Sequence, residues 1–451
     1  MAPQLPTETK VLIVGAGPTG LATAISLLKH GLSPKDMVIV DNVLTGDNSS
    51  RALTIHAATL EALETIDCAD TIRSLGTGTE AIRIRDRKAT DLFSGDFSYL
   101  SSYTKYPFTI VLSQKFTEKV LHDHLESLSV HIIRPVKAVG LKVNDQGHAG
   151  LDVSFESGEV ITAQYVVAAD GSRSVIRQTA GIGFADPDGL DASVSVDPHT
   201  SQIVLADVSF SENIEHIFPT NPSGVSFGIS PGGFFLTVPQ GRQKASTKAY
   251  DTEDPVYRIG FSMPVAAGPP PSHPPAEFLQ KYINSQGPLG ISSDPTQNPT
   301  GRPVRLNTVH WSTRFRTHSA IADIFFKRLG DGQSGGVVML VGDAAHIHSP
   351  AGGQGMNLEL RDAVGLGSVL AKHIKESKHT GSNDADGLLR DFATDRRNRG
   401  LKQISLTKWL MYLITTMMNP YSVQYWFYYF VGMFPFMKRS LVWSMSGLGN
   451  R

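Results

Sequence analysis

The pattern of apolar positions near the start of the chain predicts a strand, a helix and a second strand. Residues 10–14 form a short β-branched run, which is typical of a strand buried on both faces. Residues 21–29 have helical spacing and end at His30-Gly31, and residues 37–40 form a second apolar run that ends at Asp41. The three elements have the order and length of a βαβ unit.

The chain as far as residue 185 continues in the same mixed pattern. Helical spacing covers 54–66 and 116–128, and strand-like runs cover 130–133 and 164–169. Between these two strands, the pattern predicts a small antiparallel insert with strands at 142–143 and 151–155 and a turn near 145–147.

After about Asp186 the pattern changes to alternating strand-like pieces, at 203–210, 225–229 and 234–238. Proline-rich stretches at 264–275 and 288–303 interrupt them and are typical of surface loops. Residues 337–341 then repeat the pattern of the first strand, and the chain from 388 onward is helical and unusually apolar.

These changes predict an α/β fold, α+β overall, with one domain inserted into another. We expect a Rossmann-like nucleotide-binding domain in 1–185, with its small β insert, and in 331–385, where it resumes. A sheet-rich substrate domain would occupy 186–330, and a helical C-terminal region would occupy 386–451.

Composition excludes several classes of protein. Apolar residues make up 41% of the 451-residue chain and charged residues 18%, so a large core is expected rather than disorder. The net charge of -1 provides no basic field for nucleic acid. The single cysteine, Cys68, excludes an internal disulfide framework. Because residues 1–10 are polar and lead directly into the first strand, we expect no signal peptide and a cytoplasmic protein.

The first strand is followed at once by a glycine-rich turn, Gly15-x-Gly17-x-x-Gly20. Glycines in this position allow a tight turn and close approach of the backbone to a pyrophosphate at the start of a helix. Asp41 lies 21 residues past Gly20, at the end of the second strand, where a carboxylate can accept hydrogen bonds from a ribose. This motif alone does not separate NAD from FAD, and the alternative is a turn that binds nothing.

Two further strand-to-turn sites occur later in the chain. Residues 170–177 (Asp-Gly-Ser-Arg-Ser-Val-Ile-Arg) follow an apolar strand, and a capped structural turn is the alternative interpretation. Residues 340–346 (Leu-Val-Gly-Asp-Ala-Ala-His) lead into the small residues of 349–357 and then into a helix. Backbone N–H groups and the positive end of that helix would face a ligand there, although a plain glycine-rich loop has the same pattern.

Together the three motifs resemble those of the single-component FAD-dependent aromatic hydroxylases, the para-hydroxybenzoate and phenol hydroxylase group of flavoprotein monooxygenases. The resemblance covers most of the chain and is loose only in 186–329. The stretches that match are 11–31, 50–61, 113–114, 166–177, 340–357 and 362–363. The chain lacks the Trp-x-Trp-x-Ile-Pro signature of the tryptophan halogenases, which share this fold.

The resemblance implies a set of FAD contacts. Five residues of the first motif would hold the pyrophosphate: Gly15, Gly17, Pro18, Thr19 and Gly20. Residues that resemble further FAD contacts are Asp41 at the ribose, Arg51, Gln114, Gly342, and Asp343 at the ribityl chain. Asp170 would contribute to both FAD and NAD(P)H binding. The residues expected near the isoalloxazine ring are Pro350, Gly353, Gln354, Gly355, Met356 and Asn357. Glu359 departs from the family, which often has glycine at this position.

The same resemblance implies the reaction. NADPH or NADH would reduce FAD, and a C4a-hydroperoxyflavin would insert one oxygen atom of O2 into a phenolic or electron-rich aromatic metabolite, as in secondary metabolism. Epoxidation, indole oxidation and Baeyer-Villiger oxygen insertion are alternatives with the same cofactor. A non-catalytic flavin-binding protein associated with a membrane is the alternative from another class.

No catalytic side chain is assigned by the sequence. His56 is a weak candidate, for which a structural histidine is the more expected role. Phe227 and Phe235 are candidate walls of an apolar substrate pocket. His346 and His348 have no acidic or cysteine partners at a familiar spacing, so we predict no metal site.

The C-terminal region contains 29 uncharged residues, 409–437, between Lys408 and Lys438. This length is enough to span a bilayer, but Asn419-Pro420 divides it and Pro435 ends it. Two helices packed on the body are the first expectation. A peripheral membrane contact through 409–437, aided by Trp409 and Trp426, and a spanning helix are the alternatives.

Overall fold

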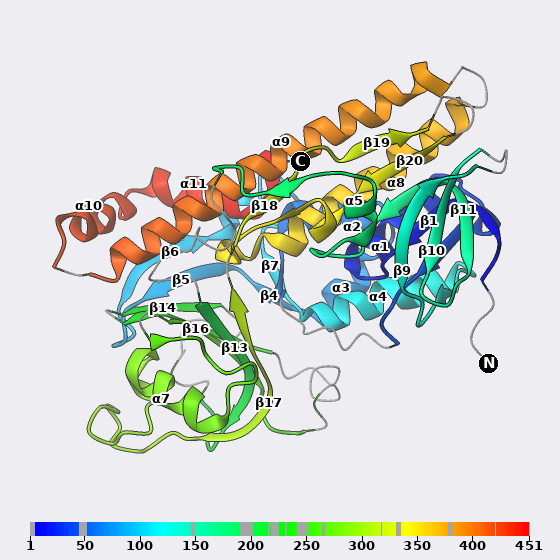
Figure 1. Ribbon diagram of the computed structural model, residues 1–451. Coiled ribbons are helices and arrows are strands. Elements are labelled where there is room, and N and C mark those ends of the chain that lie inside the picture. Colours follow the sequence, from blue (N-terminus) through cyan, green and yellow to red (C-terminus); the bar gives the residue numbers. More distant parts are fainter. Residues whose placement is uncertain are drawn as a thin grey trace.

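The computed structural model describes residues 5–44, 52–145, 149–189, 202–214, 217, 225–230, 232–240, 250, 252–263, 267–316, 318–330, 335–377, 382–419 and 421–450. Two large sheets and a set of long C-terminal helices make up the body of the molecule (Figure 1). In Figure 1 the first sheet lies at the right and the second at the lower left, and helix α9 crosses above both.

The first sheet has the strand order β19-β20-β11-β1-β2-β8, and the five strands from β20 to β8 run parallel. Its strands are β1 (Glu8–Val14), β2 (Met37–Val40), β8 (Ile132–Ile133), β11 (Val160–Ala168), β19 (Phe326–Leu329) and β20 (Gly336–Leu340). The antiparallel strands β9 (Ala138–Val143) and β10 (Leu151–Phe155) extend it from β11. Because parallel strands end at the same edge, the residues after β1, β2, β11 and β20 are brought together.

Helices cover this sheet and bury the apolar side chains of its strands. They are α1 (Pro18–Lys29), α2 (Ala57–Glu64), α3 (Ala69–Leu75), α4 (Gln114–Ser127), α5 (Val175–Thr179) and α8 (Gly355–Glu376). Small residues let α1 and α8 pack closely: a Cβ at Gly367 would lie 2.4 Å from the Cβ of Ser26. The Ser26 hydroxyl donates a 2.7 Å hydrogen bond to the carbonyl of Val364, so the contact is also specific.

The second sheet has the order β17-β13-β16-β15-β14-β5-β6. Its strands are β5 (Ala81–Arg85), β6 (Asp91–Asp96), β13 (Gln202–Phe210), β14 (Ser226–Ser230), β15 (Gly233–Pro239), β16 (Tyr257–Met263) and β17 (Leu306–Arg316). One face packs on α7 (Ala276–Gln286) through a core that includes Phe235, Ile259 and Phe261. The other face packs on α9 through a core that includes Phe234 and Met411.

Two small sheets connect the larger parts. One has the order β3-β7-β4 and contains β3 (Thr54–Ile55), β7 (Thr109–Val111) and β4 (Thr77–Thr79). The other has the order β12-β18-β21 and contains β12 (Phe184–Ala185), β18 (Ala320–Ala322) and β21 (His346–Ile347). The first of them places Thr54 and His56 near the start of α8.

The C-terminal region is helical, as predicted. It consists of α9 (Ser382–Met417), α10 (Val423–Gly432) and α11 (Pro435–Ser446). Within the described residues, no helix combines the length and the apolar character that crossing a membrane requires. The 409–437 segment is instead divided between the end of α9, α10 and the start of α11.

The predicted fold class is confirmed, including the inserted antiparallel sheet and the helical end. The predicted helix over 54–66 begins later, at Ala57, because Thr54 and Ile55 pair with β7. The centre of the predicted turn at 145–147 lies outside the described residues. Strands β5 and β6 belong to the predicted segment 1–185, yet they extend the second sheet through parallel pairing of β5 with β14. The four domain ranges stay a prediction.

A buried ion pair lies in the second sheet. The Arg258 guanidinium makes two 2.7 Å hydrogen bonds to the Asp207 carboxylate, and both side chains are about 1–2% exposed. The Tyr250 hydroxyl donates to the same carboxylate at 2.5 Å. Burial and the neighbouring Asp207 charge raise the pKa of Tyr250, so the hydroxyl keeps its proton. The group of three is thus satisfied internally.

We predict that Asp207→Ala lowers the free energy of unfolding by about 3–5 kcal/mol, because it leaves a buried guanidinium unpaired. The double variant Asp207→Leu/Arg258→Met removes both charges and should lose clearly less. Urea unfolding followed by circular dichroism measures both values. A double variant that is less stable than the single one would contradict this account of the pair.

Candidate functional site

The first glycine turn touches the second strand-to-turn site directly. Gly15 has a φ of +105°, and a Cβ added there would lie 2.2 Å from the carbonyl oxygen of Ala169 and 2.9 Å from the backbone nitrogen of Asp170. Backbone hydrogen bonds hold this approach, since Ala169 N–H donates to Val14 at 2.8 Å and Gly15 N–H donates to Val40 at 2.8 Å. Only glycine allows both the conformation and the contact.

The third strand-to-turn site meets the first in the same way. Gly342 has a φ of +68°, and a Cβ there would lie 2.7 Å from the Oγ1 of Thr19 in the first turn of α1. Val341 N–H donates to the carbonyl of Ala168 at 3.0 Å, which aligns the end of β20 with the end of β11. The three motifs that the sequence singles out therefore converge at one edge of the first sheet.

Space for a ligand lies at the start of α1. A Cβ at Gly17 would meet no atom within 4 Å, whereas one at Gly20 would lie 1.9 Å from the carbonyl oxygen of Gly15. Gly17 is the N-cap of α1, and no side chain caps the helix. Pro18 is the first helical residue and has no N–H to satisfy. The uncapped N–H groups at this positive end are suited to an anion.

Asp41 lies at the end of β2, beside this turn. Its Oδ2 accepts a 2.6 Å hydrogen bond from Ala16 N–H, and its Oδ1 accepts one at 2.8 Å from Val43 N–H. The carboxylate therefore holds the glycine turn, and its remaining acceptor capacity is suited to a ribose hydroxyl. Gln114 accepts from Ala52 N–H at 3.3 Å and donates to Glu118 at 2.8 Å. Arg51 lies outside the described residues.

The second site links to the third through Arg177. This side chain donates to the carbonyls of Ala344 at 3.0 Å and Ser172 at 2.8 Å. Asp170 accepts from Ile176 N–H at 3.2 Å through Oδ2, while its buried Oδ1 has no hydrogen-bond partner among the described residues. Burial raises the pKa of Asp170. A buried carboxyl oxygen without a partner is suited to a hydroxyl or N–H of a ligand.

Two carboxyl groups meet between the third site and the start of α8. Glu359, in the first turns of α8, is hydrogen-bonded to Asp343. Burial, followed by the nearby Asp343 charge, raises the pKa of Glu359 well above its usual value of 4.5. The protonated form of Glu359 is therefore favoured relative to an exposed glutamate. This lessens the negative charge that Glu359, which departs from the family pattern, places beside Asp343.

The loop before α8 is organised by Asn357. Its Nδ2 donates to the carbonyls of Thr54 at 2.8 Å and Gly353 at 2.7 Å, and its Oδ1 accepts from His56 N–H at 2.8 Å. Gly353 has a φ of +63°, and a Cβ there would lie 2.4 Å from the Oγ1 of Thr54. The side chain of Asn357 is therefore fully used within the protein.

Of the other predicted ring contacts, Pro350 and Gly353 are exposed, whereas Gln354 and Met356 are buried. Gln354 donates through Nε2 to the carbonyl of Met445 at 2.8 Å, so its amide also serves the fold. Gly355, at the start of α8, has only backbone groups to offer a ligand. This division of roles between side chain and backbone does not follow from the motif alone.

His56 lies under the same loop and has a partner for each ring nitrogen. Nε2 is 3.1 Å from the carbonyl oxygen of Gly352, and Nδ1 is 3.1 Å from the Oγ1 of Thr109. Because a carbonyl only accepts, Nε2 carries the proton and Nδ1 accepts from the threonine. Burial lowers the pKa of His56 to about 4, so the ring is neutral. These contacts favour the structural role that the sequence analysis expected.

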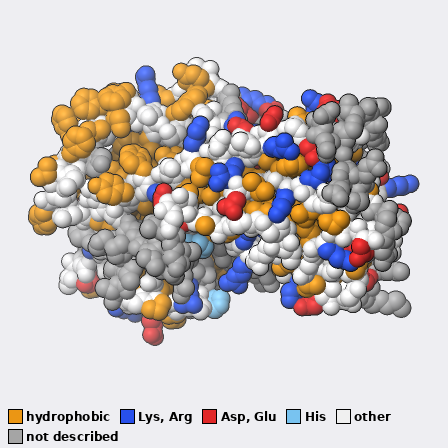
Figure 2. Space-filling model, turned by 45° about the horizontal axis from the view of Figure 1, so that its top comes forward, with side chains coloured by type: hydrophobic (Ala, Val, Ile, Leu, Met, Phe, Trp, Pro, Cys, Tyr) orange, Lys and Arg blue, Asp and Glu red, His pale blue; other side chains and the backbone are white. Residues whose placement is uncertain are grey.

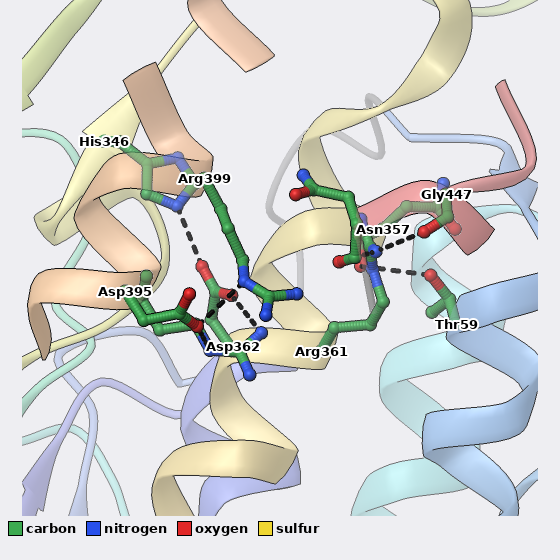
Figure 3. A network of polar contacts seen from close by, with 10 residues as sticks. Thr59, His346, Asn357, Arg361, Asp362, Asp395, Arg399 and Gly447 are labelled. Carbon is green, nitrogen blue, oxygen red and sulfur yellow. Dashed lines mark hydrogen bonds and ion pairs between the residues drawn. The ribbon is translucent and has the colours of Figure 1, made fainter. Parts of the chain in front are cut away.

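A polar network that the sequence did not predict lies along α8 (Figure 3). His346 Nε2 is 3.2 Å from Asp362 Oδ2, and Arg396 of α9 donates to Asp362 Oδ1 at 3.4 Å. On the other side of α8, Arg361 donates to the carbonyls of Gly447 at 3.0 Å and Asn450 at 2.8 Å. This network fixes α8 between β21 and the C-terminal residues.

The histidines of this region show no metal-ligand arrangement. In the part of the chain that the structure describes, no three or more His, Cys, Asp or Glu side chains form a group that could hold a metal ion. His348 stacks at 6.2 Å on His346, and burial followed by the His346 charge lowers its pKa to about 4.

Apolar side chains from the second sheet pack against residues next to β3 and in β7. Leu53, Val111 and Val238 form a buried cluster, with Val225 and Leu236 packed against it. Phe227 stacks on Phe234 at 5.1 Å, on the face that meets α9. Phe235 points to the opposite face, in the α7 core, and stacks on Phe261 at 6.2 Å. Because side chains alternate along β15, Leu236 and Val238, rather than Phe235, point toward β3 and β7.

We predict that Asn357→Asp lowers the free energy of unfolding by about 2–4 kcal/mol. The substitution replaces an NH2 group that donates to two carbonyls with a carboxylate oxygen that repels them. Urea unfolding of the variant measures the loss. The matched control is Asn398→Asp on the exposed side of α9, which should change stability little. Equal losses in the two variants would contradict the role assigned to Asn357.

We predict that Glu359 makes the stability of the apoprotein fall as pH rises from about 4.5. The folded protein keeps a proton on this carboxyl that the unfolded chain releases, so unfolding becomes more favourable until pH exceeds the raised pKa. Glu359→Gln should flatten this part of the curve of unfolding free energy against pH. The control is Glu277→Gln, an exposed glutamate in the first turn of α7. A curve that Glu359→Gln leaves unchanged would contradict the assignment.

Comparison with known proteins places these features in a family. The model of a family described as an FAD binding domain matches residues 8–258 and 297–402. The chain is 28% identical over 379 residues to pentachlorophenol 4-monooxygenase of Sphingobium chlorophenolicum, covering 82% of this chain and 59% of the relative. It is 30% identical over 394 residues to the uncharacterized aromatic compound monooxygenase YhjG of Bacillus subtilis (strain 168), covering 85% and 67%. It thus spans about three fifths of the length of the first of these relatives.

The fold also matches solved structures of this kind. Crystalline p-nitrophenol 4-monooxygenase from Pseudomonas putida DLL-E4 superposes with a TM-score of 0.72 over 99% of this chain and 100% of its own, at 21% identity. The family match covers all three strand-to-turn sites and the start of α8. This chain therefore belongs to the FAD binding domain family of the FAD-dependent aromatic monooxygenases, the group that its three glycine-rich motifs resemble.

Proposed function

We propose that the protein is an FAD-dependent, NAD(P)H-consuming monooxygenase that inserts one atom of O2 into a phenolic or electron-rich aromatic compound. The observation that supports this most is the contact of three glycine-rich strand ends at one edge of the first sheet, through Gly15 with Ala169 and Gly342 with Thr19. One relative is named as a monooxygenase of pentachlorophenol and another as a monooxygenase of an aromatic compound, and these names support an aromatic substrate.

The residues present are suited to FAD. The open position at Gly17 and the uncapped start of α1 provide room and N–H donors for a pyrophosphate, and Asp41 has acceptor capacity for the adenosine ribose. The unpartnered Oδ1 of Asp170 and the unpartnered Oγ of Ser349 are buried polar atoms that a bound cofactor would satisfy. Asp343 would bind the ribityl chain, and the start of α8 would lie against the isoalloxazine ring.

When bound, FAD would supply the redox chemistry, in which it takes electrons from NADPH or NADH and activates O2 for transfer of one oxygen atom. The protein's own groups have three tasks. The positive end of α8, a helix of 22 residues, would stabilise negative charge at the ring. Asn357 and His56 hold the loop in front of that helix in place. Glu359, whose pKa is raised, would moderate the charge of Asp343 through their hydrogen bond.

Exclusion of water from the oxygen-transfer step is the task of the apolar cluster. Leu53 and Val111 from the first half of the chain face Val238 and Leu236 from the second sheet. A wall of this kind lowers the local dielectric constant and limits loss of activated oxygen to water. We assign these residues, together with Phe227, to the substrate side of the site. Phe235 would support that wall from the α7 core behind it.

The nicotinamide cofactor would bind transiently. The pattern Gly-x-Gly-x-x-Gly recurs only at 330–335, where the chain passes from strand β19 to strand β20 and not from a strand to a helix, so it is no second dinucleotide-binding unit. We therefore assign NAD(P)H to the surface near Asp170, as the resemblance to the family implies. A comparison of NADPH with NADH as electron donor identifies the preferred form.

The proposal predicts that Gly17→Leu abolishes FAD binding without unfolding the protein. Gly17 has a φ of -72°, which any residue adopts, and its Cβ position meets no protein atom within 4 Å, so the new side chain would fill only ligand space. We expect FAD affinity, measured by quenching of flavin fluorescence, to fall roughly a hundredfold or more. The control is Gly140→Leu, at another open position in β9, which should bind FAD as wild type does.

The activity itself is tested with the wild-type protein reconstituted with FAD. NADPH or NADH oxidation should rise when a fitting phenol is added, and one ¹⁸O atom from ¹⁸O2 should appear in the product. Product structure separates hydroxylation from epoxidation, indole oxidation and Baeyer-Villiger insertion. Protein that binds no FAD in this assay would overturn the proposal.

A further inference from the structure

The large exposed apolar side chains of the protein are concentrated at one end. Of the sixteen such side chains in the described part of the chain, ten lie between Trp409 and Phe436. Six of them, on α10 and at the start of α11, are called the aromatic face here: Val423, Trp426, Phe427, Phe430, Phe434 and Phe436. Figure 2 shows hydrophobic side chains gathered at the left end of the molecule, the end at which α10 lies in Figure 1.

The aromatic face follows the geometry of a helix. Val423, Trp426, Phe427 and Phe430 have the spacing i, i+3, i+4 and i+7, so they lie along one side of α10. These four side chains are 60–83% exposed. The opposite side of α10 is already packed, because Tyr425 lies against the core formed by α9 and the second sheet. The helix is therefore apolar on its outer side as well as on its inner side.

The segment that carries this face has charges of one sign, although Asp86, from the turn between β5 and β6, lies near Tyr425 of α10. From residue 396 to 451 the chain has eight Lys and Arg and no Asp or Glu. Lys438 and Arg439 directly follow the aromatic face on α11, and neither forms an ion pair with a described residue. The guanidinium of Arg439 lies 4.9 Å from the ring centre of Tyr99 and is exposed. The face is thus bordered by cations that are free to meet an anionic surface.

This combination favours a lipid surface over a second copy of the chain. A symmetric dimer would place the same face against itself and bring Lys438 and Arg439 of both copies together, and the segment 396–451 has no acidic residue to offset them. Anionic lipid headgroups complement these cations, and Trp, Tyr and Phe side chains are suited to the boundary between headgroups and acyl chains. With 10 residues, α10 is also too short to cross the hydrocarbon layer.

We propose that the aromatic face is a membrane-surface anchor, which inserts into the headgroup region of an anionic bilayer while α10 lies parallel to the membrane plane. Trp426, Phe427 and Phe430 enter the interface, and Lys438 and Arg439 contact the lipid phosphates. This inference does not depend on the proposed oxygenation reaction. It deepens only the general prediction of a membrane contact by 409–437, by assigning the side chains and the lipid charge.

The experiment is flotation of the 451-residue protein with vesicles of phosphatidylcholine, with and without phosphatidylserine. Wild type should float with the anionic vesicles, and added salt should reduce the bound fraction. The triple variant Trp426→Ser/Phe427→Ser/Phe430→Ser should bind at least about tenfold more weakly. The variant Lys438→Gln/Arg439→Gln should lose the preference for phosphatidylserine.

The matched control removes three exposed apolar side chains elsewhere, in the variant Val139→Ser/Val160→Ser/Ile324→Ser, and should float as wild type does. Brominated lipids add a measurement on unaltered protein: they should quench its tryptophan emission when it binds. Absence of wild-type flotation with both vesicle types would overturn the proposal. So would equal loss in the control variant, or a concentration-dependent dimer, seen by light scattering, that the triple variant abolishes.

Discussion

The close approach of the ends of β1, β11 and β20 is the constraint on which the rest of the site depends. A Cβ at Gly15 would lie 2.2 Å from the Ala169 oxygen, and that oxygen belongs to backbone held by the hydrogen bond from Ala169 N–H to Val14. The neighbour cannot move away without breaking the parallel pairing of β1 with β11. At Gly342 the neighbour is instead the side chain of Thr19 in α1, and the φ of +68° itself favours glycine. The absence of side chains at these positions therefore determines the positions of the N-termini of the helices and of the space for the cofactor.

Carboxyl groups surround this space, although the proposed ligand is itself an anion. The negative charge of Asp41 is stabilised by hydrogen bonds from two backbone N–H groups, those of Ala16 and Val43. Burial raises the pKa of Asp170, and burial together with Asp343 raises that of Glu359, so these groups tend toward their neutral forms. The positive ends of α1 and α8 point at the same region. The arrangement thus provides hydrogen-bond partners for ribose and ribityl hydroxyls without a strong local negative charge.

The sequence predicted the elements and motifs well because each depends on residues that are close along the chain. Strand β1, the turn at Gly15 and helix α1 follow one another directly, and periodicity marks each of them. Contacts between distant residues were not predicted. Asp207 meets Arg258 across two strands, and Arg361 meets Gly447 across 86 positions, which no local pattern encodes. The alternation of side chains along β15 indicates that the strand has two faces, but not which face lies toward β3 and β7. The sequence therefore did not show whether Phe235 or Leu236 lies on that face.

The C-terminal helices connect the proposed anchor to the part of the molecule that contains the first sheet and α8. On their inner side, Met411 and Tyr425 complete the core beneath the second sheet. Farther along, the Met445 carbonyl accepts from Gln354, in the loop before α8. Helix α10 is therefore connected to the loop before α8 through its packing on α11 and one buried hydrogen bond. These contacts join the proposed lipid-binding face to the loop, whereas coupling between the two would require that the helices have two alternative arrangements.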